Sequence, residues 1–223
     1  MKFITETALR NRYQENRFES FVLHEGEKLT PAARQFLTDK KIKIHSVAPV
    51  AEKPEHCTHL RGSVLVAKDH PVIKFRGQLD LLEANFILCI QSALSSGHQG
   101  LAADLNVIFL YLQEIMRAEV RDKPLPFIDF HGWSADEVRE YSHHPEKHLG
   151  AKHTFPDPKH GALYGEIHKL RAMVRQLEIT GVEAFRGESG DQRERPDILL
   201  AVNRLSSLLY ILICQLLGGQ YET

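Results

Sequence analysis

The chain lacks the short motifs by which many nucleotide-binding and hydrolytic enzymes are recognised. It has no Gly-x4-Gly-Lys-Ser/Thr phosphate loop and no Gly-x-Gly-x-x-Gly turn, so any nucleotide site must be built in another way. It also has no Gly-x-Ser-x-Gly nucleophile turn and no His-Glu-x-x-His zinc motif. These absences exclude the commonest layouts for nucleotide binding, serine hydrolysis and zinc proteolysis.

Cysteine and net charge are also scarce. There are three cysteines, Cys57, Cys89 and Cys214, an odd and widely spaced set that indicates no disulfide framework and favours a reducing cytoplasm. The formal charge is only -1 over 223 residues, without the basic stripe of a nucleic-acid binder, so we expect no nucleic-acid partner.

Segments typical of membrane insertion or export are missing as well. The opening residues MKFITETALRNR contain no apolar signal core. The apolar run Leu199 to Leu217 is interrupted by Asn203 and Arg204. We therefore interpret this run as a core helix and expect no membrane partner.

What is present is strong helical periodicity, clearest between Gly161 and Phe185. Apolar residues recur there at steps of three and four, which predicts a helix with a buried seam. Ionisable residues recur at the same spacing one position along, so they share the adjacent wall of the helix. The apolar row is Leu163, Ile167, Leu170, Val174 and Leu177, and the ionisable row is Tyr164, His168, Arg171, Arg175 and Glu178.

Two arginines beside a buried seam are costly unless an anion or a carboxylate meets them. Guanidinium groups bind phosphate oxygens in pairs, so Arg171 and Arg175 are candidate ligands of an anionic substrate. Asn203 and Arg204 are a second polar interruption and can converge on the same ligand. Salt bridges or caps within the bundle, or between subunits, are the alternative for all of these residues.

The pattern predicts an all-α fold, a five-helix-type bundle with a small mixed α/β appendage at the N-terminus. We expect the appendage over residues 1–50, a linker and nucleotide-loop segment over 51–76, and the bundle over 77–223. Helices are expected over residues 77–95, 100–121, from a Ser134–Glu137 capping box toward His148, over 161–185, and from Pro196 to about Leu217.

The 13 histidines include two loose clusters. Neither has the tight repeated spacing of a zinc knuckle, so we interpret both as solvated loop histidines, with metal ligation as the alternative. The clusters are His143, His144, His148, His153 and His160, and His45, His56, Cys57 and His59.

Several segments in order resemble one family. KPEHCTHLRGSVLVAKDHP, FRGQLDLLEA, LRAMVRQLE and RPDILLAVNRLSS, with the opening FITETALR and LTPAARQFL, resemble ATP:cob(I)alamin adenosyltransferases of the ethanolamine-utilisation type. That type is related to the propanediol-utilisation type. Each motif alone is modest, and their order and spacing together are specific.

The resemblance implies roles for named residues. It implies a pair between Asp80 and Arg171, across a subunit boundary in the wider family, and hence a homo-oligomer whose site lies between subunits, dimer or trimer. It also implies that Phe155, in HTFPDP, lies in the loop under the corrinoid ring. Its implied ATP-holding residues are Lys68, Arg175, Glu178, Asn203 and Arg204.

Two departures from the family pattern stand out. The Gly-rich loop that cradles the triphosphate is missing; Thr58 to Ser63 takes its place, and Arg61 is the nearest likeness to a phosphate ligand. The cysteine-rich metal motif of some ethanolamine-type members is also missing, since threonine and arginine occupy positions 58 and 61. We therefore expect no structural iron or zinc site, with Mg²⁺ arriving with ATP.

The implied reaction is transfer of the adenosyl group from ATP to Co(I) of reduced cobalamin, with Arg175 and Phe155 as the catalytic candidates. ATP and the corrinoid are the expected partners, with a flavoprotein reductant as a further one, in the cytoplasm or at a bacterial microcompartment. One alternative is a non-catalytic corrinoid or nucleotide carrier or sensor, and another is a purely structural bundle. On residues alone, Phe155 is better interpreted as a plug that holds a loop on the bundle.

Overall fold

A computed structural model describes residues 2–24, 26–46, 53–153, 155–187 and 193–221. The chain forms two compact units, Met1–Glu55 and His56–Thr223, and each is described by itself. The end of the expected appendage and the start of the expected linker (residues 47–52) lie outside the described residues, as does part of the loop before the last helix (188–192).

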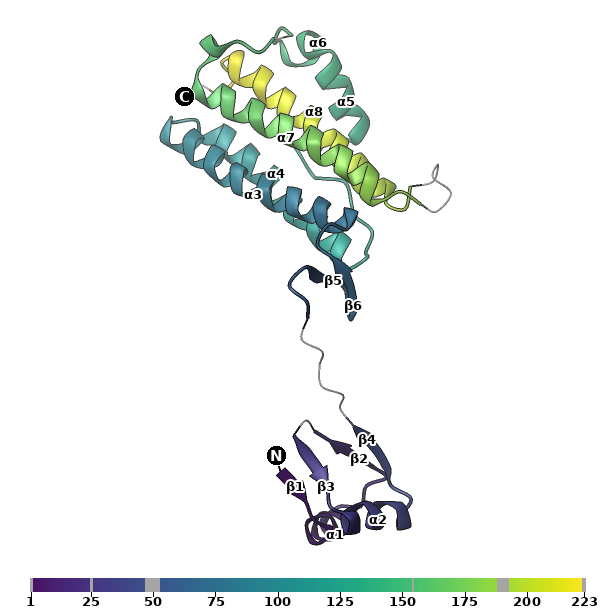
Figure 1. Cartoon of the computed structure of the whole chain (residues 1–223). Helices are drawn as coiled ribbons and strands as arrows, with labels where there is room; N and C mark the ends of the chain where they lie inside the picture. Colours follow the sequence, from purple (N-terminus) through teal and green to yellow (C-terminus); the bar gives the residue numbers. More distant parts are fainter. Residues whose placement is uncertain (1, 25, 47–52, 154, 188–192, 222–223) are drawn as a thin grey trace. The chain divides into compact units, whose positions relative to one another are not determined.

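The first unit consists of two β–α–β passes (Figure 1). The first pass is β1 (Lys2–Ile4), α1 (Glu6–Glu15) and β2 (Ser20–Leu23), and the second is β3 (Glu27–Leu29), α2 (Pro31–Asp39) and β4 (Lys43–Ser46). Strand β1 pairs in parallel with β3, and β2 with β4. Thr5 and Thr30 cap the two helices by accepting hydrogen bonds from Ala8 and Ala33.

This unit has its own core, formed by Leu9, Phe21, Ala33, Phe36, Leu37 and Ile42. It confirms the expected small mixed appendage. The strands β1 and β3 have three residues each, and the sequence analysis predicted neither of them. Three-residue strands give too short a pattern to separate from a helix start.

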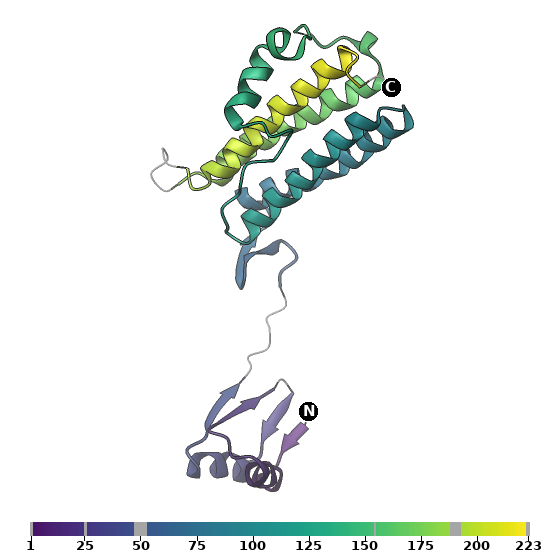
Figure 2. The same ribbon diagram turned by 180° about the vertical axis from the view of Figure 1, so that it is seen from behind.

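The second unit is a helical bundle, as expected (Figures 1 and 2). A hairpin of β5 (Cys57–Arg61) and β6 (Val64–Ala67) precedes the long helices α3 (Pro71–Ser95) and α4 (Gln99–Val120). Two short helices, α5 (Ala135–His143) and α6 (Pro145–Leu149), lie against α8. The turn η1 (Pro158–His160) leads into α7 (Ala162–Ala184), and α8 (Pro196–Leu217) completes the bundle.

Local chemistry sets the helix boundaries, and it corrects two expected ones. Helix α3 begins at Pro71, ahead of the expected residue 77, because His70 caps it by accepting from the Val72 amide at 3.2 Å. The helix opened by the Ser134–Glu137 capping box ends at His143. Pro145 then starts α6, since proline cannot continue the hydrogen-bond ladder of the preceding helix.

The long helices approach closely at one end of the bundle. Gly181 on α7 has no side chain, and a Cβ there would lie 3.3 Å from both Phe75 and Leu199. The ring of Phe75 packs edge-on against Phe185 at 5.1 Å. Glycine at this position thus lets α3, α7 and α8 meet where the candidate site begins.

Helix α8 carries much of the core. By length and composition it is the one helix in the described part of the chain that could cross a membrane, and 56% of its most apolar window is buried. Residues from Ile198 to Cys214 on its inward faces belong to the main core or are otherwise fully buried. That burial agrees with the expected core helix.

Candidate functional site

The ionisable row expected on residues 161–185 lies on α7, and two of its members, Arg171 and Glu178, contact Tyr210 and Asn203 of α8. The apolar row is internal, with Ile167, Val174 and Leu177 fully buried. In the other row Tyr164 is buried, His168, Arg171 and Glu178 are half-buried, and Arg175 is exposed. The row and the facing residues of α8 form a polar seam along the bundle, which we call the α7–α8 seam.

At one end of the seam, three side chains orient one another. The Asn203 amide nitrogen donates to Glu178 Oε1 at 2.7 Å, and Arg204 Nη1 donates to Asn203 Oδ1 at 2.6 Å. Arg204 Nε donates to the Ala135 carbonyl at 2.8 Å, which ties the start of α5 to α8. The structure therefore brings together three of the five residues that the resemblance assigned to ATP.

Arg175 lies beside this group on the outer face of α7. Together with Glu178 and Arg186 it lines an open hollow of about 550 Å³. Its guanidinium has no ion pair with any described residue, and it lies close enough to Arg171 to repel it. An exposed arginine without a carboxylate partner is available to an anionic ligand.

The other end of the seam opens into a pocket of about 420 Å³ lined by residues of α5, α7 and α8 and by His153 and Pro156. Arg171 borders this pocket, and its Nε is buried without a hydrogen-bond partner among the described residues. Burial and the neighbouring Arg175 lower the pKa of Arg171. The Arg171 guanidinium stacks over the Tyr210 ring at 5.3 Å, and this cation–π contact compensates part of the free-energy cost of burying the charge.

His153 anchors the loop that carries Phe155. Its Nε2 lies 3.0 Å from the His143 carbonyl and its Nδ1 lies 2.7 Å from the Tyr210 hydroxyl. Because a carbonyl only accepts, Nε2 carries a proton, and in the neutral ring Nδ1 accepts from the Tyr210 hydroxyl. Phe155, two positions along, is 85% exposed, so it does not plug the loop onto the bundle within this chain.

Lys68 and Asp80 lie outside the seam. Lys68 follows β6 and is exposed, and Asp80 is exposed on α3. Arg171 and Asp80 make no ion pair within the described residues of one chain. Their pairing across a subunit boundary stays a prediction.

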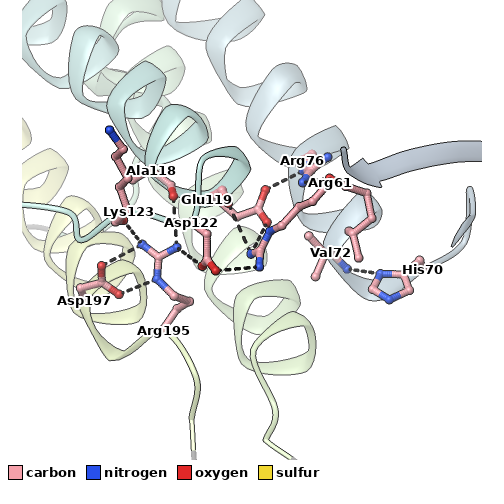
Figure 3. Close-up of polar contacts among 11 residues, drawn as sticks. Arg61, His70, Val72, Arg76, Ala118, Glu119, Asp122, Lys123, Arg195 and Asp197 are labelled. Atoms are coloured by element: carbon pink, nitrogen blue, oxygen red, sulfur yellow. Dashed lines mark hydrogen bonds and ion pairs between the residues drawn. The ribbon is translucent and has the colours of Figure 1, made fainter. Parts of the chain in front are cut away.

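Arg61 is held in an ion network of its own (Figure 3). Its Nη2 lies 3.3 Å from Glu119 Oε1 and its Nη1 lies 3.2 Å from Asp122 Oδ2. Arg76 also binds Glu119, at 2.6 Å, and Arg195 binds Asp197 at 2.8 Å. The only expected phosphate ligand of the hairpin therefore already has carboxylate partners.

Several histidines of the first cluster make local contacts. His144 and His148 lie within 3.9 and 3.2 Å of Glu140, and His160 packs on Tyr164. In the described part of the chain, no three His, Cys, Asp or Glu side chains are grouped so that they could hold a metal ion.

Sequence reasoning missed Glu119, Arg76, Tyr210 and His153 as part of the local architecture. A signal for Glu119 was present: it continues the buried stripe of α4 four residues after Ile115, and a carboxylate at a core position needs a cationic partner. His153 and Tyr210 had no comparable signal, because their contact joins a loop to a helix 57 residues away.

Two family models together match nearly the whole chain. Residues 50–216 match the family model described as cobalamin adenosyltransferase. Residues 3–49 match the model described as the corrinoid adenosyltransferase EutT N-terminal domain.

Curated relatives match over nearly the whole chain. Corrinoid adenosyltransferase EutT of Salmonella typhimurium is 30% identical over 247 aligned positions, which cover 95% of this chain and 91% of the relative. The protein of the same name from Escherichia coli is 29% identical over the same shares. With a bundle carrying the polar α7–α8 seam and a family model that spans most of the sequence, the chain belongs to the cobalamin adenosyltransferase family of enzymes.

Proposed function

We propose that the protein transfers the 5′-deoxyadenosyl group of ATP to Co(I) of reduced cobalamin, giving adenosylcobalamin and triphosphate. The observation that carries this proposal is the α7–α8 seam. It offers an exposed arginine and an oriented Glu178–Asn203–Arg204 group at one end, and a pocket bordered by the unpartnered Arg171 Nε at the other. Two ligands can thus lie end to end along one pair of helices.

The protein supplies orientation and charge, while the reduced corrinoid supplies the nucleophile that attacks C5′ of ATP. Arg175 and Arg204, with Lys68, are the cations proposed to stabilise the departing triphosphate. Glu178 and Asn203 would fix the nucleotide so that C5′ faces the metal, since correct placement alone can contribute about 7–11 kcal/mol. No nucleophile–base pair is needed on the protein.

Phe155 is proposed to act at the lower face of the corrinoid. Reduction of Co(II) to Co(I) is difficult while a fifth ligand remains below the metal, and an apolar ring excludes water and the nucleotide tail. The 85% exposure of Phe155, beside a loop anchored through His153, supports a side chain that is free to contact a ligand.

Mg²⁺ is proposed to enter with the triphosphate. Magnesium is commonly held by one or two carboxylates and substrate phosphates rather than by a protein cage. Glu178 is a carboxylate of the seam and lines the hollow beside Arg175, and the described residues contain no group of three or more potential metal ligands. Glu178 is therefore the residue that would reach the ion or its water shell.

A site between subunits is also proposed, because Lys68, Asp80 and Arg175 are all exposed within one chain. Large apolar side chains are exposed on the outer faces of α3 and α4, which supports a homo-oligomer. They are Leu81, Ile87, Leu88 and Leu110. We also propose a cytoplasmic role in ethanolamine breakdown, on the resemblance to that type.

The direct test is to incubate the protein with ATP, Mg²⁺ and reduced cobalamin and to follow the absorption spectrum. Formation of the adenosylcobalamin spectrum, dependent on ATP, is the expected result. The competing function is a non-catalytic carrier or sensor, favoured by the missing Gly-rich loop and by Arg61 having carboxylate partners. A carrier would bind both ligands in calorimetry without spectral conversion, and a structural bundle would bind neither.

A further inference from the structure

A fully buried carboxylate lies outside the α7–α8 seam, at the end of α4. Glu119 has no exposed side-chain surface, and its two oxygens are shared between Arg76 Nε at 2.6 Å and Arg61 Nη2 at 3.3 Å (Figure 3). Burying a charge is costly unless it is paired in good geometry. Removing the Glu119 carboxylate would therefore deprive both guanidiniums of their buried anionic partner at once.

The two guanidinium edges of Arg61 meet different surroundings. Nη2 contacts the buried Glu119, both its carboxylate and its carbonyl, the latter at 3.4 Å. Nη1 contacts Asp122 at 3.2 Å, and Asp122 is 61% exposed. The Nη2 edge of Arg61 is thus fixed by a buried residue, whereas the Nη1 edge contacts only the exposed carboxylate of Asp122.

The same network fixes the hairpin that replaces the Gly-rich loop. Arg61 is the last residue of β5, and Arg76 Nη2 donates to the Leu60 carbonyl at 2.8 Å. Strand β6 then leads to Lys68. Glu119, through its two arginines, therefore holds the strand that precedes the hairpin turn against α3 and α4.

The ion pair between Asp122 and Arg61 can break at a small cost in free energy. Exposed ion pairs contribute little to stability, and Asp122 Oδ1 already lies 4.0 Å from Arg195 Nη1. Arg195 is held independently, by Asp197 and by the carbonyls of Ala118 and Lys123. A triphosphate carries more charge than one carboxylate and accepts two guanidinium hydrogen bonds at a time, so it would compete effectively for Nη1.

We propose that Glu119 is a positioning residue of the nucleotide site: it anchors Arg61 by its inner edge so that the outer edge can exchange Asp122 for the ATP triphosphate. This inference rests on the proposed function. It answers how a chain without the Gly-rich loop can present a phosphate ligand from the hairpin.

The experiment measures the KM for ATP, the KM for the corrinoid and kcat in the adenosyl-transfer assay, with ATP affinity from calorimetry as a second readout. For Glu119→Gln we expect the KM for ATP to rise at least fivefold, with kcat within twofold and the corrinoid KM unchanged. Asp122→Asn should change the KM in the opposite direction, lowering it about twofold, because the competitor for Arg61 is gone. Glu114→Gln, at an exposed pair on the same helix, is the matched control and should change nothing.

A double variant separates positioning from folding. Arg76→Met with Glu119→Leu leaves no uncompensated charge in the core, so its melting temperature should recover relative to Glu119→Gln. If Glu119 only stabilises the fold, the KM for ATP recovers too, and the proposal is overturned. If Glu119 positions Arg61, the KM stays raised because the inner edge remains unanchored.

Two further outcomes also decide the matter. An unchanged KM in Glu119→Gln, or a KM in Asp122→Asn that rises like that of Glu119→Gln, contradicts the proposal. Absence of transfer by the unmodified protein contradicts the proposed function instead. Calorimetry with ATP then still tests this inference, since equal affinity in Glu119→Gln and the unmodified protein would refute it.

Discussion

Asn203 of α8 donates a 2.7 Å hydrogen bond to Glu178 of α7, and this contact joins the two helices that carry most of the candidate site. Asn203 also accepts from Arg204, which in turn holds the start of α5. Each of these groups is oriented by its neighbour rather than by solvent. Such mutual support keeps a binding site close to its working geometry.

Asn203→Asp should break this arrangement. The substitution replaces the donor that faces Glu178 by a second carboxylate, and repulsion at this distance is unfavourable. We expect the fold to lose about 1–3 kcal/mol of stability and ATP affinity to fall by at least tenfold. Denaturant unfolding and calorimetry measure the two effects. Asn106→Asp, on the exposed face of α4, is the control, and equal ATP affinity in both variants would argue against the role.

Arg175→Ala should remove a cation from the triphosphate without harming the fold, because this side chain is exposed and has no ion pair with a described residue. We expect kcat/KM for ATP to fall at least a hundredfold, about 2.7 kcal/mol in transition-state stabilisation. Circular dichroism should show unchanged helix content. Arg117→Ala, an exposed arginine on α4, is the control. Normal transfer by Arg175→Ala would remove Arg175 from the proposed role.

Phe155→Ala should impair the reduction of Co(II) to Co(I) more than the transfer of the adenosyl group to Co(I). We expect activity with cob(II)alamin bearing its lower base to fall far more than activity with preformed Co(I), because only the first substrate requires removal of the lower ligand. Stability should be unchanged, since the ring is 85% exposed. Activity with each substrate is followed by the appearance of adenosylcobalamin. Equal losses with both substrates would contradict a water-excluding role.

Asp197 should make stability depend on acid pH. Burial opposes its ionisation, but hydrogen bonds from Arg195 and the Leu125 amide outweigh it and lower the pKa of this carboxyl from 3.8. A lowered pKa stabilises the fold above the unfolded-state value, and this stabilisation is lost as pH falls through the folded-state value. Asp197→Asn should therefore cost about 1–3 kcal/mol at pH 7. Urea unfolding at pH 7 and pH 3 should show the difference from the unmodified protein shrinking at the lower pH, and a constant difference would contradict the linkage.

The three cysteines should differ sharply in reactivity. Burial, with the charge of Glu166 nearby, raises the pKa of Cys89 to about 12, and Cys214 is fully buried. Cys57 on β5 is partly exposed. Ellman's reagent at pH 8 should therefore modify one thiol quickly in the native protein and all three in denaturant. The Cys57→Ser variant should show no fast phase, and a persistent fast phase would place Cys89 or Cys214 in a mobile region.

The sequence predicted those parts of the site that depend on spacing within one helix. The row from Tyr164 to Glu178 shares a face because of helical periodicity alone, and the capping box at Ser134 rests on residues three apart. The fold class followed from the same periodicity. These predictions needed no knowledge of which helix packs against which.

The same reasoning could not predict contacts between segments that are far apart in the sequence. The partner of Arg61 lies 58 residues away, and nothing in the hairpin sequence points to Glu119. The outer position of Arg175 and the exposure of Phe155 likewise depend on packing against other elements. Whether Arg171 meets Asp80 depends on a second chain, which one sequence does not place.

The two hydrophobic cores have a consequence for how the chain melts. The first unit packs around Leu9 and Phe36 and the bundle packs around α8, so each unit can unfold cooperatively by itself. Thermal denaturation of the whole chain then need not follow a single two-state curve. A melting temperature fitted to a single transition would average the unfolding of the small first unit with that of the larger bundle. The calorimetric and van't Hoff enthalpies of unfolding would then disagree.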